Sequence, residues 1–190
     1  MVSYHIYQTE GIILGKKNIG EADRIFSVLT REFGRIDAIA QGIRRVESKL
    51  RYSMGTFSYA RLGLVASRTS WRIVDAEELN NWKNIRETPE KLAAVFQIAE
   101  LINRMVKGQE HDTSLWKEVK SAFLFLEQYK NAQGEGDLQI FGLLAQLKIL
   151  SHLGYVAEHE KWFNLSLEEV QKMKPLIIFA INKALQESQL

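Results

Sequence analysis

The densest chemistry in the sequence is a run of cationic side chains within eight residues: Arg44, Arg45, Lys49 and Arg51. Guanidinium and ammonium groups bind phosphate oxygens, and each nucleic-acid phosphate that they neutralise releases counterions. The same run could also be a flexible, solubilising loop. We favour phosphate contact because the strand predicted before the loop carries a further cation, Arg35, on its polar face. Lys16 and Lys17 are secondary candidates.

Several aromatic residues lie near these cations in the sequence: Tyr52, Phe57, Tyr59 and Trp71. Nucleobases stack on aromatic faces, and each stack contributes about 1–3 kcal/mol. Burial in the core of a small domain is the alternative for each of them. Phe57 and Tyr59 are predicted to share a strand face with Arg61, so Tyr59 and Arg61 join the candidate site.

The charge of the chain is unevenly distributed. Residues 16–72 contain 12 Lys and Arg against 5 Asp and Glu, whereas residues 81–190 contain 13 against 14. A basic first half suggests a polyanionic partner. The alternative is a solvated surface that is basic without a partner.

Enzymatic signatures are missing from the sequence. It contains no cysteine and no Walker A, GxGxxG, GxSxG or HExxH motif. Glu158, His159 and Glu160 are interpreted as an exposed polar turn, and Asp23 is interpreted as a turn-stabilising group rather than half of a dyad with Glu21. We therefore expect no enzyme, no catalytic residue, no metal and no cofactor.

The absence of cysteine is compatible with a reducing compartment. The N-terminal residues lack a basic region followed by an apolar run, so no signal peptide is expected. No stretch approaches the ~20 apolar residues of a membrane span. We expect a cytoplasmic protein without a membrane partner.

Alternation of apolar and polar residues predicts five strands in the first 80 residues, at 4–16, 24–30, 35–41, 56–65 and 71–76. The run at 24–30 also fits a helix, but Phe33 and Gly34 follow it as a hairpin turn. In the third strand, Ile36, Ala38 and Ala40 share one face. Gly11 is expected at a bend or bulge, and residues 42–55 form the basic loop. Five closely spaced strands predict a small barrel or sandwich.

Apolar residues recur at helical spacing after residue 81. Thr88 and Pro89 begin the first predicted helix, which ends near Gly108, and a second begins near Thr113. A linker at 131–136 precedes a third, central helix at 137–153. Ser166 and Glu169 form a capping box. Pro175 is expected to break or restart the last helix. The second half is therefore predicted to be a helical bundle.

Several short strings, taken in order, resemble the RecO family of bacterial recombination mediators. They are TEGI (9–12), GEADR (20–24), LTRE (29–32), GRI (34–36) and GIRR (42–45), with LSHLGY at 150–155 as a second match. The resemblance implies an N-terminal OB-fold β-barrel at 1–80 and an α-helical bundle domain at 81–190, an α+β fold. Many family members carry a four-cysteine zinc knuckle, but residues 156–167 have no cysteine and look shortened.

The resemblance also implies a function. RecO proteins bind single- and double-stranded DNA, anneal complementary strands, and with RecR help load RecA onto DNA coated by single-strand-binding protein. No nucleotide hydrolysis is implied. The alternative is a protein-interaction adaptor on an OB scaffold, for which DNA binding is incidental.

Overall fold

The computed structural model describes residues 5–67, 70–129, 135–156 and 165–188. Contacts between Cα atoms divide the chain into two compact units. The barrel unit comprises Met1–Trp82 and Lys107–Trp116, and the helical unit comprises Lys83–Val106 and Lys117–Leu190. Across the described ranges, no helix has both the length and the apolar character that a membrane span requires.

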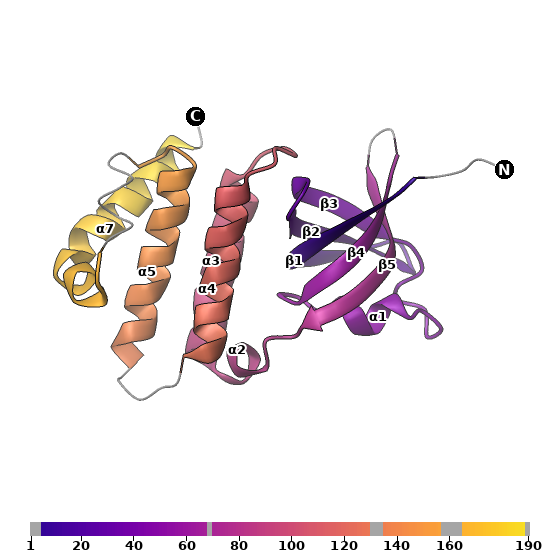
Figure 1. Cartoon of the computed structure of the whole chain (residues 1–190), viewed down its shortest axis with the longest axis horizontal. Helices are drawn as coiled ribbons and strands as arrows, with labels where there is room; N and C mark the ends of the chain where they lie inside the picture. Colours follow the sequence, from indigo (N-terminus) through magenta and orange to yellow (C-terminus); the bar gives the residue numbers. More distant parts are fainter. Residues whose placement is uncertain (1–4, 68–69, 130–134, 157–164, 189–190) are drawn as a thin grey trace. The chain divides into compact units, whose positions relative to one another are not determined.

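The described residues of the barrel unit form a closed barrel of five strands (Figure 1). These are β1 (Ile6–Ile19), β2 (Asp23–Thr30), β3 (Gly34–Ala40), β4 (Tyr59–Ala66) and β5 (Trp71–Asn80). Their order around the barrel is β1-β2-β3-β5-β4, and β1 closes the barrel by pairing with both β2 and β4. Only β3 and β5 pair in parallel among these strands. This is the five-stranded topology of an OB fold, so the predicted barrel is confirmed.

Period-two alternation explains which side chains fill the barrel. Ile36, Ala38 and Ala40 of β3 are buried in the core, as predicted, while Asp37 is exposed. Successive side chains of a strand point to opposite faces, so a one-residue shift would expose the whole apolar set. The core set is Ile13, Phe26, Val28, Ile36, Ala38, Ala40, Ile43, Met54, Ala60, Leu62, Leu64, Trp71 and Ile73.

Gly11 allows close packing inside the barrel, and the predicted bulge does not fall at this residue. A Cβ there would lie 2.7 Å from Cγ1 of Val28 and 3.1 Å from Cδ1 of Leu62. The register shift of β1 falls between Ile13 and Gly15 instead. The predicted start of the fourth strand at residue 56 is also wrong, because β4 begins at Tyr59 and Phe57 has a left-handed φ of 66°.

Residues 107–116 pack on the barrel although they follow it by 25 residues in sequence. The Nε1–H of Trp71 donates a hydrogen bond to Oε1 of Gln109 at 3.0 Å. Gly34 has a φ of +61°, and a Cβ on it would lie 2.3 Å from the carbonyl oxygen of Glu110. Glycine is therefore required at this turn by both backbone conformation and space.

The described helices are α1 (Leu50–Ser53), α2 (Lys83–Glu87), α3 (Pro89–Met105), α4 (Thr113–Gln128), α5 (Glu135–His152) and α7 (Leu167–Glu187). Thr88 is the N-cap of α3, as predicted, and α4 begins at Thr113, as predicted. In the helical unit, α5 contacts both α3 and α7, which explains why apolar residues cover most of its faces.

Pro175 lies inside α7 and does not end it, so the predicted break is wrong. Proline removes one backbone hydrogen bond of a helix. Buried side chains on both sides of it, Val170 before and Ile177, Ile181 and Ala184 after, hold α7 in one piece. The capping box is confirmed: Ser166 Oγ accepts from the Glu169 backbone N–H, and the Glu169 carboxylate accepts from the Ser166 backbone N–H.

Some expectations fall outside the described residues. They concern Tyr4 in the first strand, residues 68 and 69 of the turn before β5, residues 131–134 of the linker, the Glu158–His159–Glu160 turn, and most of the segment at 156–167. The domain bounds 1–80 and 81–190 stay a prediction.

Candidate nucleic-acid interface

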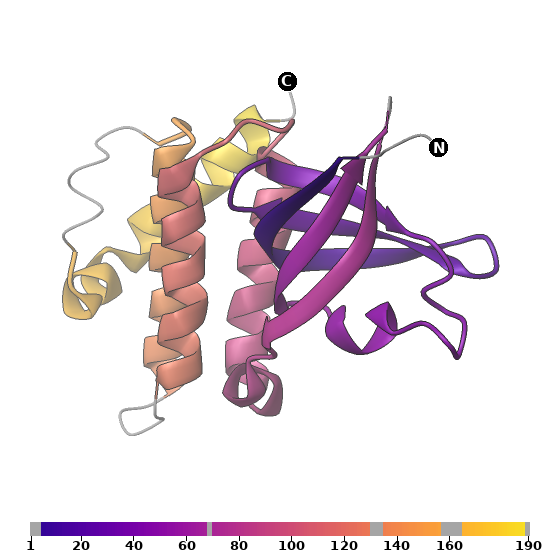
Figure 2. The same cartoon turned by 45° about the vertical axis from the view of Figure 1, so that its right-hand side comes forward.

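The basic loop, residues 42–55, is held at both ends by buried apolar side chains. Ile43 and Met54 are part of the barrel core, and Leu50 packs against it. The loop was predicted without regular structure, but it contains α1 and successive turns. The backbone N–H groups of Arg45, Ser48 and Tyr52 donate to the carbonyls of Gly42, Arg45 and Lys49, respectively. The loop therefore has local structure and is anchored to the barrel core; its short helix α1 lies below the strands in Figure 2.

Three hydrogen bonds tie the start of the basic loop to the turn between β1 and β2 and to the first residue of β2. The backbone N–H of Gly42 donates to Oδ1 of Asp23 at 2.7 Å. The backbone N–H of Arg44 donates to the carbonyl of Ala22 at 2.9 Å, and its guanidinium donates to the carbonyl of Gly20 at 3.0 Å. The GEADR and GIRR strings, separate in sequence, thus form one substructure. The interpretation of Asp23 as a turn-stabilising group agrees with this geometry.

This arrangement brings two groups of predicted cations to the same end of the barrel. Lys16 and Lys17 are exposed on β1 in the hairpin that ends at the β1–β2 turn. Arg44, Arg45, Lys49 and Arg51 are exposed in the basic loop. Over the described ranges, the side chains of Arg45 and Lys49 make no hydrogen bond or ion pair, whereas that of Arg44 is engaged by Gly20. Arg45 and Lys49 are thus better placed for phosphate than Arg44.

Arg35 does not join this cluster. It lies at the start of β3, and Gly42 follows the end of that strand, so the strand separates them by roughly 20 Å at ~3.3 Å per residue. Its guanidinium donates to Oδ1 of Asp37 at 3.0 Å, and its side chain is only 21% exposed.

Arg61 lies among acidic side chains. Its cross-strand partners on β1 and β5 are Glu10 and Glu77, and its guanidinium forms a 2.6 Å ion pair with Glu77. The local charge around Arg61 does not favour a polyanion.

Tyr59 is buried, at 9% exposure, so the expected stacking face is not available in this structure. Its ring centroid lies 6.1 Å from that of Trp82 and 6.3 Å from that of Trp116. Its hydroxyl donates to a carboxylate oxygen of Glu10. Both faces of β4 are covered at this point, which alternation within one strand cannot reveal.

The exposed aromatic residue of the basic loop is Tyr52, which is 74% exposed. The guanidinium carbon of Arg51 lies 5.5 Å from the centroid of its ring. The sequence placed Tyr52 beside the cations but gave no sign of its exposure. The signal available in the sequence was its position directly after the cationic run, in the predicted loop rather than on a strand.

No three His, Asp or Glu side chains of the described ranges lie close enough together to hold a metal ion. The expectations of no metal and no catalytic residue stay predictions.

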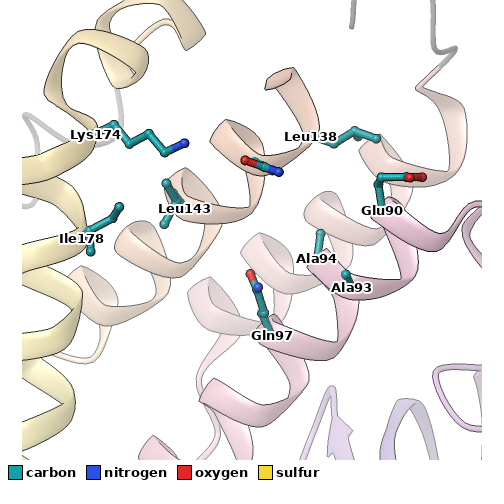
Figure 3. Close-up of a pocket in the computed structure, with 9 residues that line it drawn as sticks. Glu90, Ala93, Ala94, Gln97, Leu138, Leu143, Lys174 and Ile178 are labelled. Carbon is teal, nitrogen blue, oxygen red and sulfur yellow. The ribbon is translucent and has the colours of Figure 1, made fainter. Parts of the chain in front are cut away.

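A separate hollow lies within the helical unit, between α3, α5 and α7. It has a volume of about 370 Å³ and an apolar lining of Ala93, Ala94, Leu138, Leu143 and Ile178. Figure 3 shows Lys174 on the side of Leu143 and Ile178, whereas Glu90 lies toward Leu138. The pocket therefore has a cationic end and an acidic end.

Comparison with known proteins gives a consistent result. Residues 2–81 match the family model described as "Recombination protein O N terminal". "DNA repair protein RecO" of Caldanaerobacter subterraneus is 29% identical over 149 residues, 78% of this chain and 58% of that protein. The RecO of Rubrobacter xylanophilus is 32% identical over 147 residues, 77% of this chain and 57% of that protein. The RecO of Pelotomaculum thermopropionicum is 28% identical over 150 residues, 79% of this chain and 56% of that protein.

The aligned part of the chain thus spans little more than half the length of these relatives. The family match covers β1 to β5, including the hairpin turn and the basic loop. Through this barrel, and through its relatives, the chain belongs to the RecO family.

Proposed function

We propose that this protein binds single- and double-stranded DNA in recombinational DNA repair, through the basic loop and the β1–β2 hairpin. The proposal rests on the hydrogen bonds that join the β1–β2 hairpin to the basic loop. Because of them, exposed cations of both segments lie at one end of an OB barrel: Lys17, Arg45, Lys49 and Arg51. The names of the relatives, all DNA repair protein RecO, support the repair role.

The proposed mechanism is electrostatic. The cations neutralise phosphates and let two complementary strands approach, which promotes annealing without a catalysed covalent step. Sequence preference is expected to be low because the proposed contacts are made to the backbone. RecR, single-strand-binding protein and, indirectly, RecA are the proposed partners in loading a recombinase onto single-stranded DNA.

The test is equilibrium binding to an oligonucleotide over a salt series. The double variant Arg45→Ala/Lys49→Ala should weaken binding and reduce the slope of log K against log[salt] by about 1.4 on single strands. Arg44 is left intact because its guanidinium also holds the hairpin turn. The matched control is Arg61→Ala, which removes an exposed cation paired with Glu77. An unchanged slope in the double variant would exclude this loop as the DNA site.

The adaptor alternative is favoured by one observation, the pocket in the helical unit. The end with Lys174, Leu143 and Ile178 combines a cation with apolar side chains, which suits the acidic, hydrophobic tail of single-strand-binding protein. Lys174→Glu should weaken binding of a synthetic tail peptide, whereas Lys117→Glu on α4 should not. If the chain binds the tail peptide but does not bind DNA at ~100 mM salt, the adaptor function is favoured over the DNA-binding function.

A further inference from the structure

Tyr52 presents its ring to solvent from an anchored position. The side chain is 74% exposed, although tyrosine is usually at least half-buried. Two residues away on either side, Leu50 packs against the barrel core and Met54 belongs to it. The backbone N–H of Tyr52 also donates to the carbonyl of Lys49. The ring therefore projects from a fixed point of the barrel.

The surroundings of this ring are cationic. Arg51 lies over it, with its guanidinium carbon 5.5 Å from the ring centroid, and Lys49 and Arg45 are exposed in the same loop. Val46 is exposed as well, at 77%, so the loop offers apolar surface as well as charge. Glu47 is the acidic residue of residues 42–55. Cations for phosphates beside an aromatic face for bases are the two components of a single-strand site.

A duplex cannot use this ring in the same way as a single strand. In a duplex, the faces of the bases are covered by neighbouring base pairs, so a projecting ring can stack only where a base is unpaired. The phosphates, in contrast, are available in both forms. The cations should thus contribute to the binding of both single-stranded and duplex DNA, whereas the ring should contribute to the binding of single-stranded DNA.

We propose that Tyr52 is a base-stacking platform that makes the basic loop prefer unpaired over paired DNA. The inference rests on the proposed function and adds the residue that sets strand preference. Tyr52 contacts a base, while Arg45, Lys49 and Arg51 contact the phosphates on either side of it.

The experiment compares Tyr52→Ala and Tyr52→Phe with the wild-type chain on a single-stranded oligonucleotide and on the duplex of the same sequence. Tyr52→Ala should weaken single-strand binding by about 5- to 150-fold and change duplex binding by less than about twofold. Tyr52→Phe keeps the ring and should bind single strands within about twofold of wild type. Tyr155→Ala, an exposed tyrosine of the helical unit, is the control and should change neither.

A second probe removes the bases instead of the ring. A single strand of abasic nucleotides keeps the phosphates, so wild type and Tyr52→Ala should bind it equally. The inference would be overturned if Tyr52→Ala lost affinity equally for single strand and duplex, or lost none for the single strand. It would also be overturned if wild type and Tyr52→Ala still differed in affinity for the abasic strand.

The outcomes separate the two proposals. If Tyr52→Ala has no effect while Arg45→Ala/Lys49→Ala flattens the salt slope, stacking is refuted and DNA binding by the loop stands. If the double variant leaves the slope unchanged, the loop is not the DNA site, whatever Tyr52 does.

Discussion

The carboxylate of Asp23 accepts a hydrogen bond from the backbone N–H of Gly42 at 2.7 Å, across 19 residues of sequence. This contact joins the first residue of β2, directly after the β1–β2 turn, to the first residue of the basic loop. Asp23 also lies within a region whose proposed ligand is a polyanion. Its negative charge should oppose DNA binding. We therefore infer that Asp23 orders the loop through its hydrogen bond and does not contact DNA.

Asp23→Ala gives a clear test because the two roles predict opposite signs. Loss of a negative charge alone should strengthen DNA binding. Loss of the anchor should weaken it, by about fivefold if the loop forfeits about 1 kcal/mol of ordering. We expect weaker binding, measured by fluorescence anisotropy with a labelled single strand. Glu21→Ala is the matched control, since Glu21 is exposed in the same turn, and it should bind equally well or more tightly. Tighter binding by Asp23→Ala would contradict the positioning role.

Gly34→Ala should destabilise the barrel unit by about 2–4 kcal/mol, since it combines a positive φ with a steric clash. The added methyl group would meet the carbonyl oxygen of Glu110 at 2.3 Å. Gly20→Ala separates the two contributions, because Gly20 also has a positive φ but no atom within 4 Å of the added Cβ. It should cost about 1–2 kcal/mol. Denaturant unfolding measures both, and equal losses would show that the contact with residues 107–116 does not constrain Gly34.

Arg35→Ala tests the separation of Arg35 from the basic loop. Arg35 lies at the far end of β3 and is paired with Asp37, so its removal should change the salt slope of DNA binding by less than about 0.3, against about 0.7 for one phosphate contact on single strands. Arg45→Ala, measured beside it, should give the full change. If Arg35→Ala flattens the slope as much as Arg45→Ala, the DNA path extends along β3.

Alternation within single strands was enough to predict the barrel, because each strand buries one face against the same core. It failed at Tyr59, since Trp82 and Trp116 cover the outer face of β4 from distant parts of the chain. It also missed the hydrogen bonds of Asp23 and Arg44, which join segments about 20 residues apart. The prediction of a break at Pro175 was wrong for a related reason. The backbone hydrogen bond that proline removes is offset by the burial of apolar side chains along the face of α7. The local sequence pattern thus predicts the strands and helices, whereas the candidate nucleic-acid interface depends on contacts between them.

The capping box of α7 should make the helical unit more stable at neutral than at acidic pH. The hydrogen bonds from the Ser166 backbone and side chain hold the pKa of Glu169 below its usual value of 4.5. A carboxyl whose pKa is lower in the folded state contributes stability above pH 4.5 and loses it as pH falls through the folded-state pKa.

Glu169→Gln keeps a capping side chain but cannot ionise. The advantage of wild type over this variant in thermal unfolding should therefore be present at neutral pH and disappear as the pH falls below 4.5 and through the folded-state pKa of Glu169. Glu168→Gln removes a neighbouring first-turn charge without altering the box, so it controls for the helix dipole. An advantage over Glu169→Gln that stays constant down to acid pH would contradict the role of the ionised carboxylate.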